Sequence, residues 1–393
     1  MLFRTPMPFR APLLLLAALT LAAQEAPLVR DGAEWVRTIN GIVAVGPQSR
    51  LEVVTRGHLV LRGVAAKHVT YRFVQRVRVD DAAQARRLMG EVATSTRNIG
   101  DLVRLTVSAE ATPLVRTDLE ISAPSDLPAV ILETQAGGVE AYDFPGGVQA
   151  VTGGGLIHAD RIGGAFLART GGGEIRLGRI GGAVRCVSGA GSIFIDSVRG
   201  DADCQTAGGD VGINDAGSFV RLSTEGGNIH VGKAAQNVEA HTASGVIDIG
   251  QAGGIVSADT RGGSIQVGSA RGIRCESAAG GVRVKTASAP LHVATSVGNI
   301  LAELLAGTHL DDSSLVADGG DITVLIPSNL AVSILAQNDS GGDPRIISDF
   351  PEIHVRRMGF VEPPLMAQGA INGGGPVLHL NTAGGTIYLR RLK

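Results

Sequence analysis

Residues 219–236 read FVRLSTEGGNIHVGKAAQ, and residues 237–254 read NVEAHTASGVIDIGQAGG. Both stretches follow one pattern of 18 residues, and that pattern runs from residue 129 to residue 307. A fixed repeat with apolar residues at alternate positions, interrupted by glycine, is typical of the coils of a β-solenoid. We therefore predict an all-β fold: a single-stranded parallel β-solenoid (β-helix) of 18-residue coils, with an N-terminal β-rich cap that contains one short helix.

Two positions of the repeat indicate how each coil is built. The ninth position is glycine, which we place at the corner between two strands because glycine alone takes positive φ freely. The sixth position is threonine or serine, and strand alternation turns it inward, where its hydroxyl can bond the turn backbone or the next hydroxyl. The ninth-position glycines are Gly137, Gly155, Gly173, Gly191, Gly209, Gly227, Gly245, Gly263, Gly280 and Gly298. The sixth-position residues are Thr134, Thr152, Thr170, Ser188, Thr206, Thr224, Thr242, Thr260, Ser277 and Thr295.

The N-terminus has the features of an export signal. Arg4 and Arg10 precede an apolar run over residues 11–23, which is too short to span a bilayer, and small residues suited to cleavage follow. We predict a signal peptide over residues 1–24 and an exported mature protein that is periplasmic or at the cell surface. Because no later stretch reaches the length of a membrane span, we expect no stable membrane insertion after cleavage.

The remaining chain divides into three parts. Residues 25–122 form a predicted β-rich capping region, in which Asp80 and Asp81 can cap one short helix over residues 82–92. This region would cover the open end of the solenoid, which otherwise exposes unpaired strand backbone. Residues 123–326 form the predicted β-solenoid, and residues 327–393 form a C-terminal β-repeat region that closes it.

A second repeated motif links the two ends of the array. The sequence ISAPSDL over residues 121–127 corresponds to VLIPSNL over residues 324–330, and each is followed by Ile-Leu and then Gly-Gly. We interpret each copy as the entry strand of a solenoid section. The array of 18-residue repeats would then be an insertion that expands the middle of a smaller module.

The C-terminal region carries motifs of a known family. The order IxVxxPSxL, a GG-bounded coil, SDFP and GGGPxLxLxTxGGxIxLR is found in residues 322–351 and 373–391. It resembles the bacterial putative-adhesin β-strand-repeat family, a domain family of unknown function, and the coil pattern extends the resemblance over residues 129–307. The resemblance implies an envelope-associated, non-enzymatic protein, with some members linked to envelope stress responses. It supplies no catalytic residues. Many members look tethered to a membrane, whereas we expect no such tether in this chain.

The cysteines are too few for a disulfide scaffold. Cys186, Cys204 and Cys275 each occupy the fourth position of their units, where other units have alanine, leucine or valine. Cys186 and Cys204 lie one coil apart, so we expect them to stack about 4.8 Å apart. The sequence leaves open whether they form a disulfide or are two small core residues, and it predicts a buried free thiol at Cys275.

Candidate catalytic residues lie on the outward positions. His230 stacks on Asp248 in the predicted array, and His241 stacks on Asp259, so each pair could be a general base with its orienting carboxylate. Neither pair has a third member nearby, and we identify no aromatic platform for a sugar ring. We therefore expect no catalytic residues.

The sequence also predicts no metal site and no cofactor. Some 18-residue β-rolls bind calcium through GGxGxD turns, but here Asp210 and Asp321 follow glycine pairs singly, as expected of solvated turn residues. A formal net charge of −2 and a pI of about 6.5 offer no bulk attraction to nucleic acid.

Taken together, these patterns favour an exported, non-enzymatic, adhesin-like binding or scaffold module of the cell envelope. Its partner would be an envelope protein or a glycan, and the sequence predicts no oligomeric state. Two alternatives stay open. One is a carbohydrate-active β-helix enzyme with a site around His230, Asp248, His241 and Asp259, and the other is a periplasmic partner in envelope-stress sensing.

Overall fold

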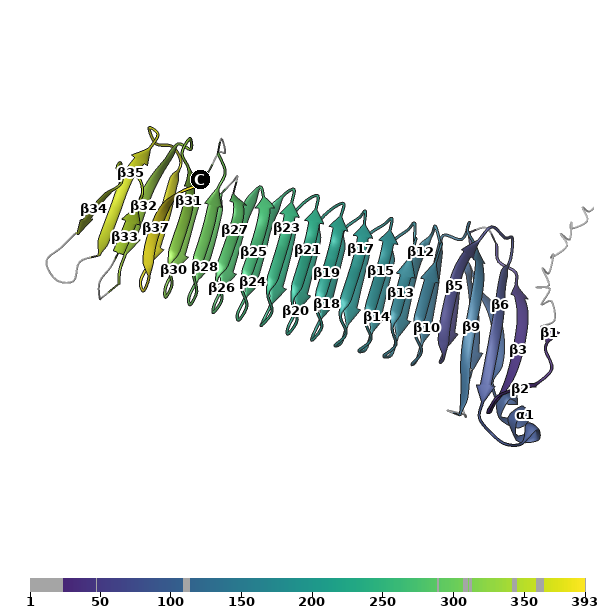
Figure 1. Cartoon of the computed structure of the whole chain (residues 1–393). Coiled ribbons are helices and arrows are strands. Elements are labelled where there is room, and N and C mark those ends of the chain that lie inside the picture. Colours follow the sequence, from purple (N-terminus) through teal and green to yellow (C-terminus); the bar gives the residue numbers. More distant parts are fainter. Residues whose placement is uncertain are drawn as a thin grey trace, which may run out of the picture.

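The computed structural model describes residues 24–46, 48–108, 114–287, 290–306, 310, 313–340, 345–357 and 364–392. Residues 1–23 of the predicted signal peptide lie outside the described residues. The described chain is all-β with a single short helix, as predicted, and its strands form two long sheets of 19 and 18 strands, here called sheet A and sheet B. Figure 1 shows an elongated molecule with the N-terminal strands at one end and the C-terminal strands at the other. Within these ranges, no helix has the length and apolar character needed to cross a membrane.

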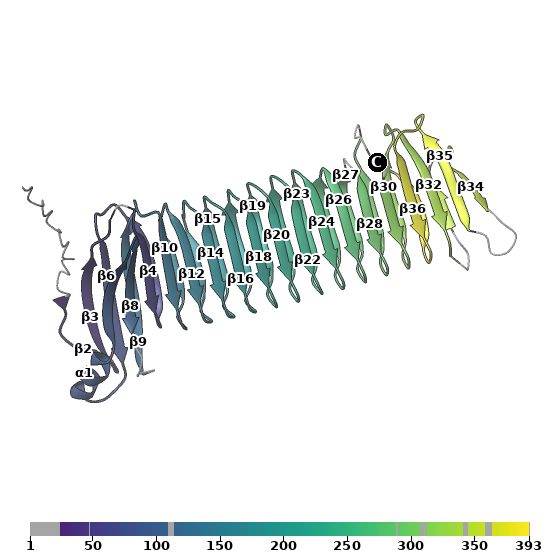
Figure 2. The same ribbon diagram turned by 180° about the vertical axis from the view of Figure 1, so that it is seen from behind.

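The central array contributes strands to both sheets in turn, and those of sheet B can be followed in Figure 2. The strands in sheet B are β10 (Ala129–Thr134), β12 (Gly147–Thr152), β14 (Phe166–Thr170), β16 (Val184–Ser188), β18 (Ala202–Thr206), β20 (Val220–Thr224), β22 (Val238–Thr242), β24 (Ile255–Thr260), β26 (Gly272–Ser277), β28 (Leu291–Thr295) and β30 (Ser313–Ala317). The strands in sheet A are β11 (Val139–Tyr142), β13 (Ile157–Asp160), β15 (Ile175–Ile180), β17 (Ile193–Val198), β19 (Val211–Ala216), β21 (Ile229–Ala234), β23 (Ile247–Ala252), β25 (Ile265–Ala270), β27 (Val282–Ala287), β29 (Ile300–Leu304) and β31 (Ile322–Pro327).

Each unit of the repeat adds one strand to each sheet and pairs in parallel with the next unit. In sheet B, β20 pairs with β22 so that Val220 lies opposite Val238, which is 18 residues later. In sheet A, β21 pairs with β23, and Ile229 lies opposite Ile247 with the same separation. Equivalent side chains of successive units therefore lie over one another, and their backbone hydrogen bonds run between units. We call one such unit a coil.

The core lies between the two sheets and is filled by small and β-branched side chains. In β20, Val220, Leu222 and Thr224 are buried, while the residues between them face outward. In β21, Ile229 and Val231 are buried by the same alternation. This burial matches the period of two that strand geometry imposes, so the inward positions were predicted correctly from the sequence.

The sixth-position hydroxyls join consecutive coils at the corner. Thr242 Oγ1 donates to the carbonyl oxygen of Gly227, one coil earlier, at 2.9 Å, and accepts from the N–H of Gly245 at 3.1 Å. The hydroxyl is thus satisfied in both of its roles although Thr242 is only 4% exposed. The predicted bonding to turn backbone is confirmed.

The ninth-position glycines are required for close packing of successive coils and not, as the sequence suggested, for positive φ. Glycines with positive φ in the described chain are Gly32, Gly100, Gly373 and Gly374, so no corner glycine there is among them. A Cβ atom on Gly245 would instead lie 1.9 Å from the carbonyl oxygen of Gly227 in the preceding coil. The prediction of positive φ was wrong, because it is the close stacking of successive corners that excludes a side chain.

The N-terminal region closes one end of the array with antiparallel strands. Its elements are β1 (Gln24–Glu25), β2 (Val29–Asp31), β3 (Glu34–Val43), β4 (Arg50–Thr55), β5 (His58–Val64), β6 (Val69–Val77), α1 (Ala82–Gly90), β7 (Ala93–Ile99), β8 (Leu102–Ser108) and β9 (Val115–Pro124). Antiparallel pairs β3–β6, β6–β9 and β7–β8 lie outermost. The side chain of Asp81 caps α1 by accepting from the N–H of Gln84 at 3.0 Å, as the sequence predicts.

The C-terminal region closes the other end. Its strands are β32 (Val332–Asn338), β33 (Arg345–Ser348), β34 (His354–Arg357), β35 (Leu365–Ile371), β36 (Val377–Thr382) and β37 (Thr386–Leu392). Antiparallel pairs β32–β35 and β34–β35 lie at this end of sheet B. Thr382 is in register with Ala317 and Ile387 with Ile322, so the coil predicted here is present.

Strands are inserted out of chain order at both ends of the array. β4 lies between β8 and β10, and β5 lies between β9 and β11, although β4 and β5 precede all four of these strands in the chain. At the other end, β36 lies between β30 and β32, and β37 lies between β31 and β33, although β36 and β37 come last. The chain end therefore returns into the array, where Figure 1 shows the C-terminus beside β31.

The repeated Pro-Ser motif marks these insertions. Each copy ends a strand in the same turn, in which the N–H of Leu127 donates to the carbonyl oxygen of Pro124 and the N–H of Leu330 donates to that of Pro327. The strand of sheet B that follows each turn does not pair with the preceding strand of that sheet. It leaves one strand position vacant, which β4 occupies between β8 and β10, and β36 between β30 and β32. Our interpretation of the motif as an entry strand is thus corrected, because it ends a strand and precedes a vacant strand position.

Candidate functional site

A hollow of about 660 Å³ lies on the outward face of sheet A, over β13 to β21. Its floor is built by Phe194 and Gly212, which occupy the same outward position on the neighbouring strands β17 and β19. Gly212 is buried at this outward position because the Phe194 ring covers it: two ring carbons lie 3.1 and 3.5 Å from where a Cβ of Gly212 would be. Phe194 is itself 42% exposed, so its ring offers an open face to solvent.

Polar side chains surround this ring. Asn214 Nδ2 donates to Asp196 Oδ1 at 3.1 Å, which fixes the two side chains against each other. Arg176 binds Glu174 through its Nε, and this contact raises the pKa of the Arg176 guanidinium above its ordinary value. The rim therefore offers amide, carboxylate and guanidinium groups within one hollow.

His158 lines the N-terminal side of the hollow, and its ring contacts that of Tyr142. The rings of His158 and Tyr142 lie 5.6 Å apart at their centroids with a tilt of 48°, and the Arg62 guanidinium lies 5.1 Å from the Tyr142 centroid. Burial and a hydrogen bond to Glu140 raise the pKa of Tyr142 to about 12. Tyr142 therefore keeps its proton at neutral pH and supports His158 from behind the lining of the hollow.

The first candidate catalytic pair lies beside this hollow and is joined as predicted. His230 Nδ1 lies 3.2 Å from Asp248 Oδ2, and the two side chains are 53% and 52% exposed. The outward neighbours at the same position are Gly212 and Gln266, neither of which supplies a second acid or base. The pair is therefore an exposed contact between adjacent coils.

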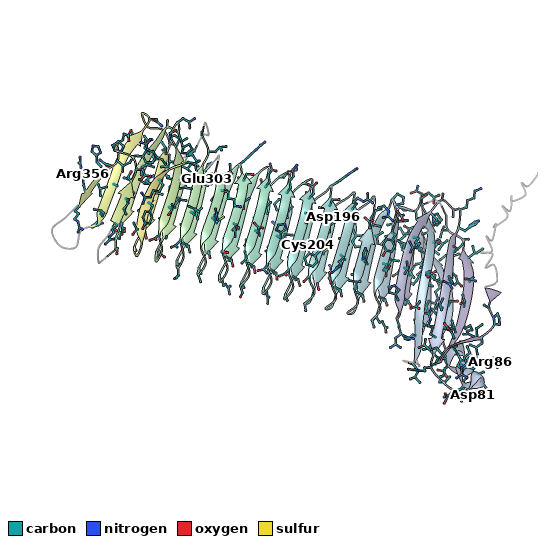
Figure 3. All side chains as sticks on the ribbon, in the orientation of Figure 1. Asp81, Arg86, Asp196, Cys204, Glu303 and Arg356 are labelled. Carbon is teal, nitrogen blue, oxygen red and sulfur yellow. The ribbon has the colours of Figure 1, made fainter. Side chains whose placement is uncertain are left out.

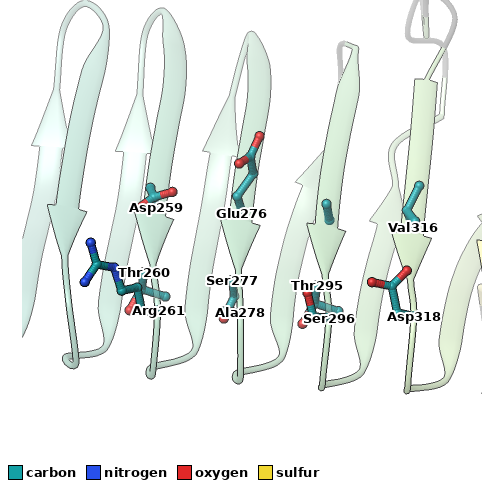
Figure 4. A pocket seen from close by; sticks show the side chains of 11 residues that line it. Asp259, Thr260, Arg261, Glu276, Ser277, Ala278, Thr295, Ser296, Val316 and Asp318 are labelled. Carbon is teal, nitrogen blue, oxygen red and sulfur yellow. The ribbon is translucent and has the colours of Figure 1, made fainter.

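The second candidate pair is in register but not bonded. His241 and Asp259 lie opposite each other on β22 and β24, and no hydrogen bond or ion pair joins them in the described chain. Asp259 instead lines a separate depression of about 440 Å³ with Glu276 and Asp318. Figure 4 shows Asp259 and Glu276 on neighbouring strands and Asp318 at the corner.

The two turn aspartates that could suggest calcium bond to backbone. Asp210 Oδ1 accepts from the N–H of Asn228 at 2.7 Å, and Asp321 Oδ1 accepts from the N–H of Thr386 at 2.7 Å. Asp210 is exposed and Asp321 half-buried, as expected of turn residues, and both carboxylates also join neighbouring coils. Across the described ranges, no three His, Cys, Asp or Glu side chains gather closely enough to hold a metal ion.

The cysteines belong to the core. Cys186 and Cys204 lie opposite each other on β16 and β18, both are fully buried, and both are free thiols in this structure. Burial, and then the neighbouring Cys204, hold the pKa of Cys186 well above its ordinary value. Cys275 is a buried free thiol, as predicted, and burial raises its pKa to about 12.

The hollow around Phe194 is the feature that sequence reasoning missed. The sequence places Phe194 among the outward residues, and the structure leaves its ring exposed within the hollow. The available signal was a phenylalanine followed one coil later by glycine at the same outward position. Elsewhere the central array carries few long side chains, and they are denser at both ends (Figure 3).

Comparison with known proteins gives structural matches alone. No family model matches the chain, and no curated protein matches it. The chain is similar to a putative cell adhesion protein from Clostridium sporogenes, with 9% identity over 90% of this chain and 99% of that chain and a TM-score of 0.19. It is similar to a putative adhesin from Bacteroides fragilis, with 11% identity, 90% and 97% coverage and a TM-score of 0.20.

A third solved structure, which matches a similar share of this chain, has a different name. It is a putative lipid binding protein from Parabacteroides distasonis, with 10% identity over 91% of this chain and 97% of that chain and a TM-score of 0.25. All three are bacterial proteins with low identity to this chain. The solved structures to which the chain is similar therefore include bacterial proteins named putative adhesins.

Proposed function

We propose that the chain is an exported, non-catalytic β-solenoid that serves as an adhesin-like binding or scaffold module of the cell envelope. Its partner in this proposal is an envelope glycan or protein, held by contact along the outward faces of the two sheets. The proposal is supported by the regular stacking of parallel coils, which produces long faces whose side chains are fixed by their neighbours.

One observation carries the proposal: several charged side chains on these faces pair with an opposite charge in the next coil. Arg221 Nε lies 2.7 Å from Glu239 Oε2 on sheet B, and Arg185 Nε lies 3.6 Å from Asp203 Oδ2 in the two preceding coils. Such pairs between exposed groups add little stability, but they spread charge evenly over a flat surface. An even, preformed surface suits contact with an extended partner, whereas catalysis requires acids and bases that converge on one point.

The enzyme alternative rests on His230 and Asp248. Their 3.2 Å contact has the geometry of a general base and its orienting carboxylate. A glycosidase of the usual kind, however, uses two carboxyl groups that flank one bond, and Asp248 has Gln266 as its next neighbour at this position. We therefore assign the pair a surface role.

A combined binding and turnover assay separates these functions. The full mature chain is mixed with insoluble bacterial envelope fractions, and co-sedimentation is measured together with the release of reducing sugar ends. We expect co-sedimentation without release, unchanged in Asp248→Asn and in Gln266→Ala, its neighbour on β25. Release of reducing ends that is lost in Asp248→Asn and kept in Gln266→Ala would establish an enzyme. Absence of both signals would contradict the binding function.

A further inference from the structure

We propose that the hollow around Phe194 binds a neutral saccharide, with one pyranose ring resting on the exposed face of the Phe194 ring. This inference rests on the proposed binding function and names its site and ligand class. The apolar C–H face of a pyranose is about as broad as a phenyl ring, so stacking buries apolar surface on both partners.

The platform is fixed by the strand beneath it. The Phe194 ring lies over Gly212, and a side chain at that position would meet ring carbons at 3.1 Å. Gly212 thus leaves room for the ring, which stays partly open to solvent. A ring held in this way loses little freedom when a ligand stacks on it, which favours binding.

The rim supplies partners for sugar hydroxyls. Asp196 and Asn214 lie side by side near the ring, and one hydrogen bond joins their side chains. Asp196 Oδ2, Asn214 Oδ1 and the second N–H of Asn214 have no other protein partner among the described residues. Sugar hydroxyls both donate and accept, so this mixture of free donors and acceptors matches them.

The balance of charge favours a neutral sugar. Of the residues that line the hollow, Arg176 is positive and Asp196 is negative, and Arg176 is already bound to Glu174. An acidic sugar would find no uncompensated cation here, and its carboxylate would lie near Asp196. The volume of about 660 Å³ lies within the range of small-molecule sites.

The test uses the full mature chain and three neutral probes: cellohexaose, maltohexaose and chitohexaose, with hexagalacturonate as the acidic comparison. Binding is measured by isothermal titration calorimetry. The key variant is Phe194→Leu, which keeps an apolar side chain over Gly212 but removes the aromatic face. The matched control is Tyr388→Leu, because Tyr388 occupies the corresponding outward position of sheet A on β37.

We expect at least one neutral hexasaccharide to bind with a Kd below about 1 mM. Phe194→Leu should weaken that binding about fivefold to tenfold, while Tyr388→Leu leaves it unchanged. The exposed rim variant Asn214→Ala, which leaves the core untouched, should weaken it about threefold or more. Thermal unfolding of each variant shows that the fold is retained.

Several outcomes would overturn the inference: no binding of any neutral probe, equal binding by Phe194→Leu, or tighter binding of hexagalacturonate. The envelope assay distinguishes this failure from failure of the proposed function. A wild-type chain that binds envelope fractions but no neutral hexasaccharide contradicts the saccharide site alone. A chain that binds neither contradicts the binding function as well.

Discussion

Thr242 and Gly227 lie 15 residues apart in the chain, yet the Thr242 hydroxyl donates to the Gly227 carbonyl oxygen at 2.9 Å. The same contact recurs along the array, from Thr152 with Gly137 to Thr295 with Gly280. In several coils the hydroxyl also accepts the N–H of a glycine in its own coil, as Thr242 does from Gly245. In these coils one short side chain therefore satisfies two backbone groups that the corner would otherwise bury unpaired.

Replacement of Thr242 by valine should destabilise the fold. Valine keeps the shape but leaves the Gly227 carbonyl and the Gly245 N–H without their partner, which costs about 1–3 kcal/mol. Thr242→Ser is the control, because Ser188 makes both contacts in its own coil at 2.9 Å. Guanidinium unfolding measures the difference. Equal stability of the valine and serine variants would show that the hydroxyl contacts do not matter.

The two glycines of one corner should respond differently to alanine. A Cβ on Gly227 would lie 2.1 Å from the Gly209 carbonyl oxygen, whereas a Cβ on Gly226 has its nearest neighbour at 3.7 Å. Because the obstacle at Gly227 is backbone, we expect Gly227→Ala to cost about 3 kcal/mol, near the upper end of overpacking costs. Gly226→Ala should be close to neutral. The free energies of unfolding of the two variants test this, and a neutral Gly227→Ala would contradict the stacking argument.

The periodic pattern was sufficient to predict the central array because each coil repeats the same physical demands. Inward positions require small or β-branched side chains, as in Val220 and Ile229, and the corner requires the hydroxyl of Thr224. The insertion of strands at both ends could not be predicted in this way. A period relates each residue to the one 18 positions later, whereas β4 pairs with β10 at a separation of 79 residues, as for Leu51 and Val130.

The candidate site was harder to predict than the fold for a related reason. Outward positions face solvent, so stacking places few demands on them and their residues vary without a period. His230 and Asp248 were found because strand register alone brings them together. The Phe194 platform depends on how one side chain leans over Gly212, which register does not determine.

Removal of the inserted C-terminal strands should expose sheet edges inside the array. A chain that ends at residue 372 lacks β36 and β37, which pair with β30 and β31 on one side and with β32 and β33 on the other. Unpaired strand edges associate with one another, so we expect larger assemblies than the full chain forms. Light scattering after size-exclusion chromatography measures this.

A peptide of residues 373–393 added in trans is the control for this truncation. It should occupy the vacant layer and return the truncated chain to the size of the full chain. A truncated chain whose size equals that of the full chain without the peptide would contradict the role of the inserted strands.

The stability of the chain should fall in alkaline solution partly through Cys275. Burial raises the pKa of Cys275 to about 12, whereas an unfolded cysteine has a pKa of about 8.5. Above pH 8.5 or so the unfolded chain releases this proton and the folded chain retains it, so the unfolded state gains stability. The protonated thiol therefore makes its full contribution to the free energy of unfolding below about pH 8.5. This contribution is lost as the pH rises toward 12, by at most about 1.4 kcal/mol for each pH unit.

Cys275→Ala isolates this contribution, because alanine is the residue at the same position of the preceding coil, where Ala258 pairs with Cys275. The other two buried cysteines are present in both proteins, so their titration cancels in the comparison. Between pH 7 and pH 10 the wild type should lose about 2 kcal/mol more than the variant in its free energy of unfolding. Chemical unfolding at the two pH values measures the loss, and an equal loss in both proteins would mean that Cys275 ionises in the folded chain as readily as in the unfolded one.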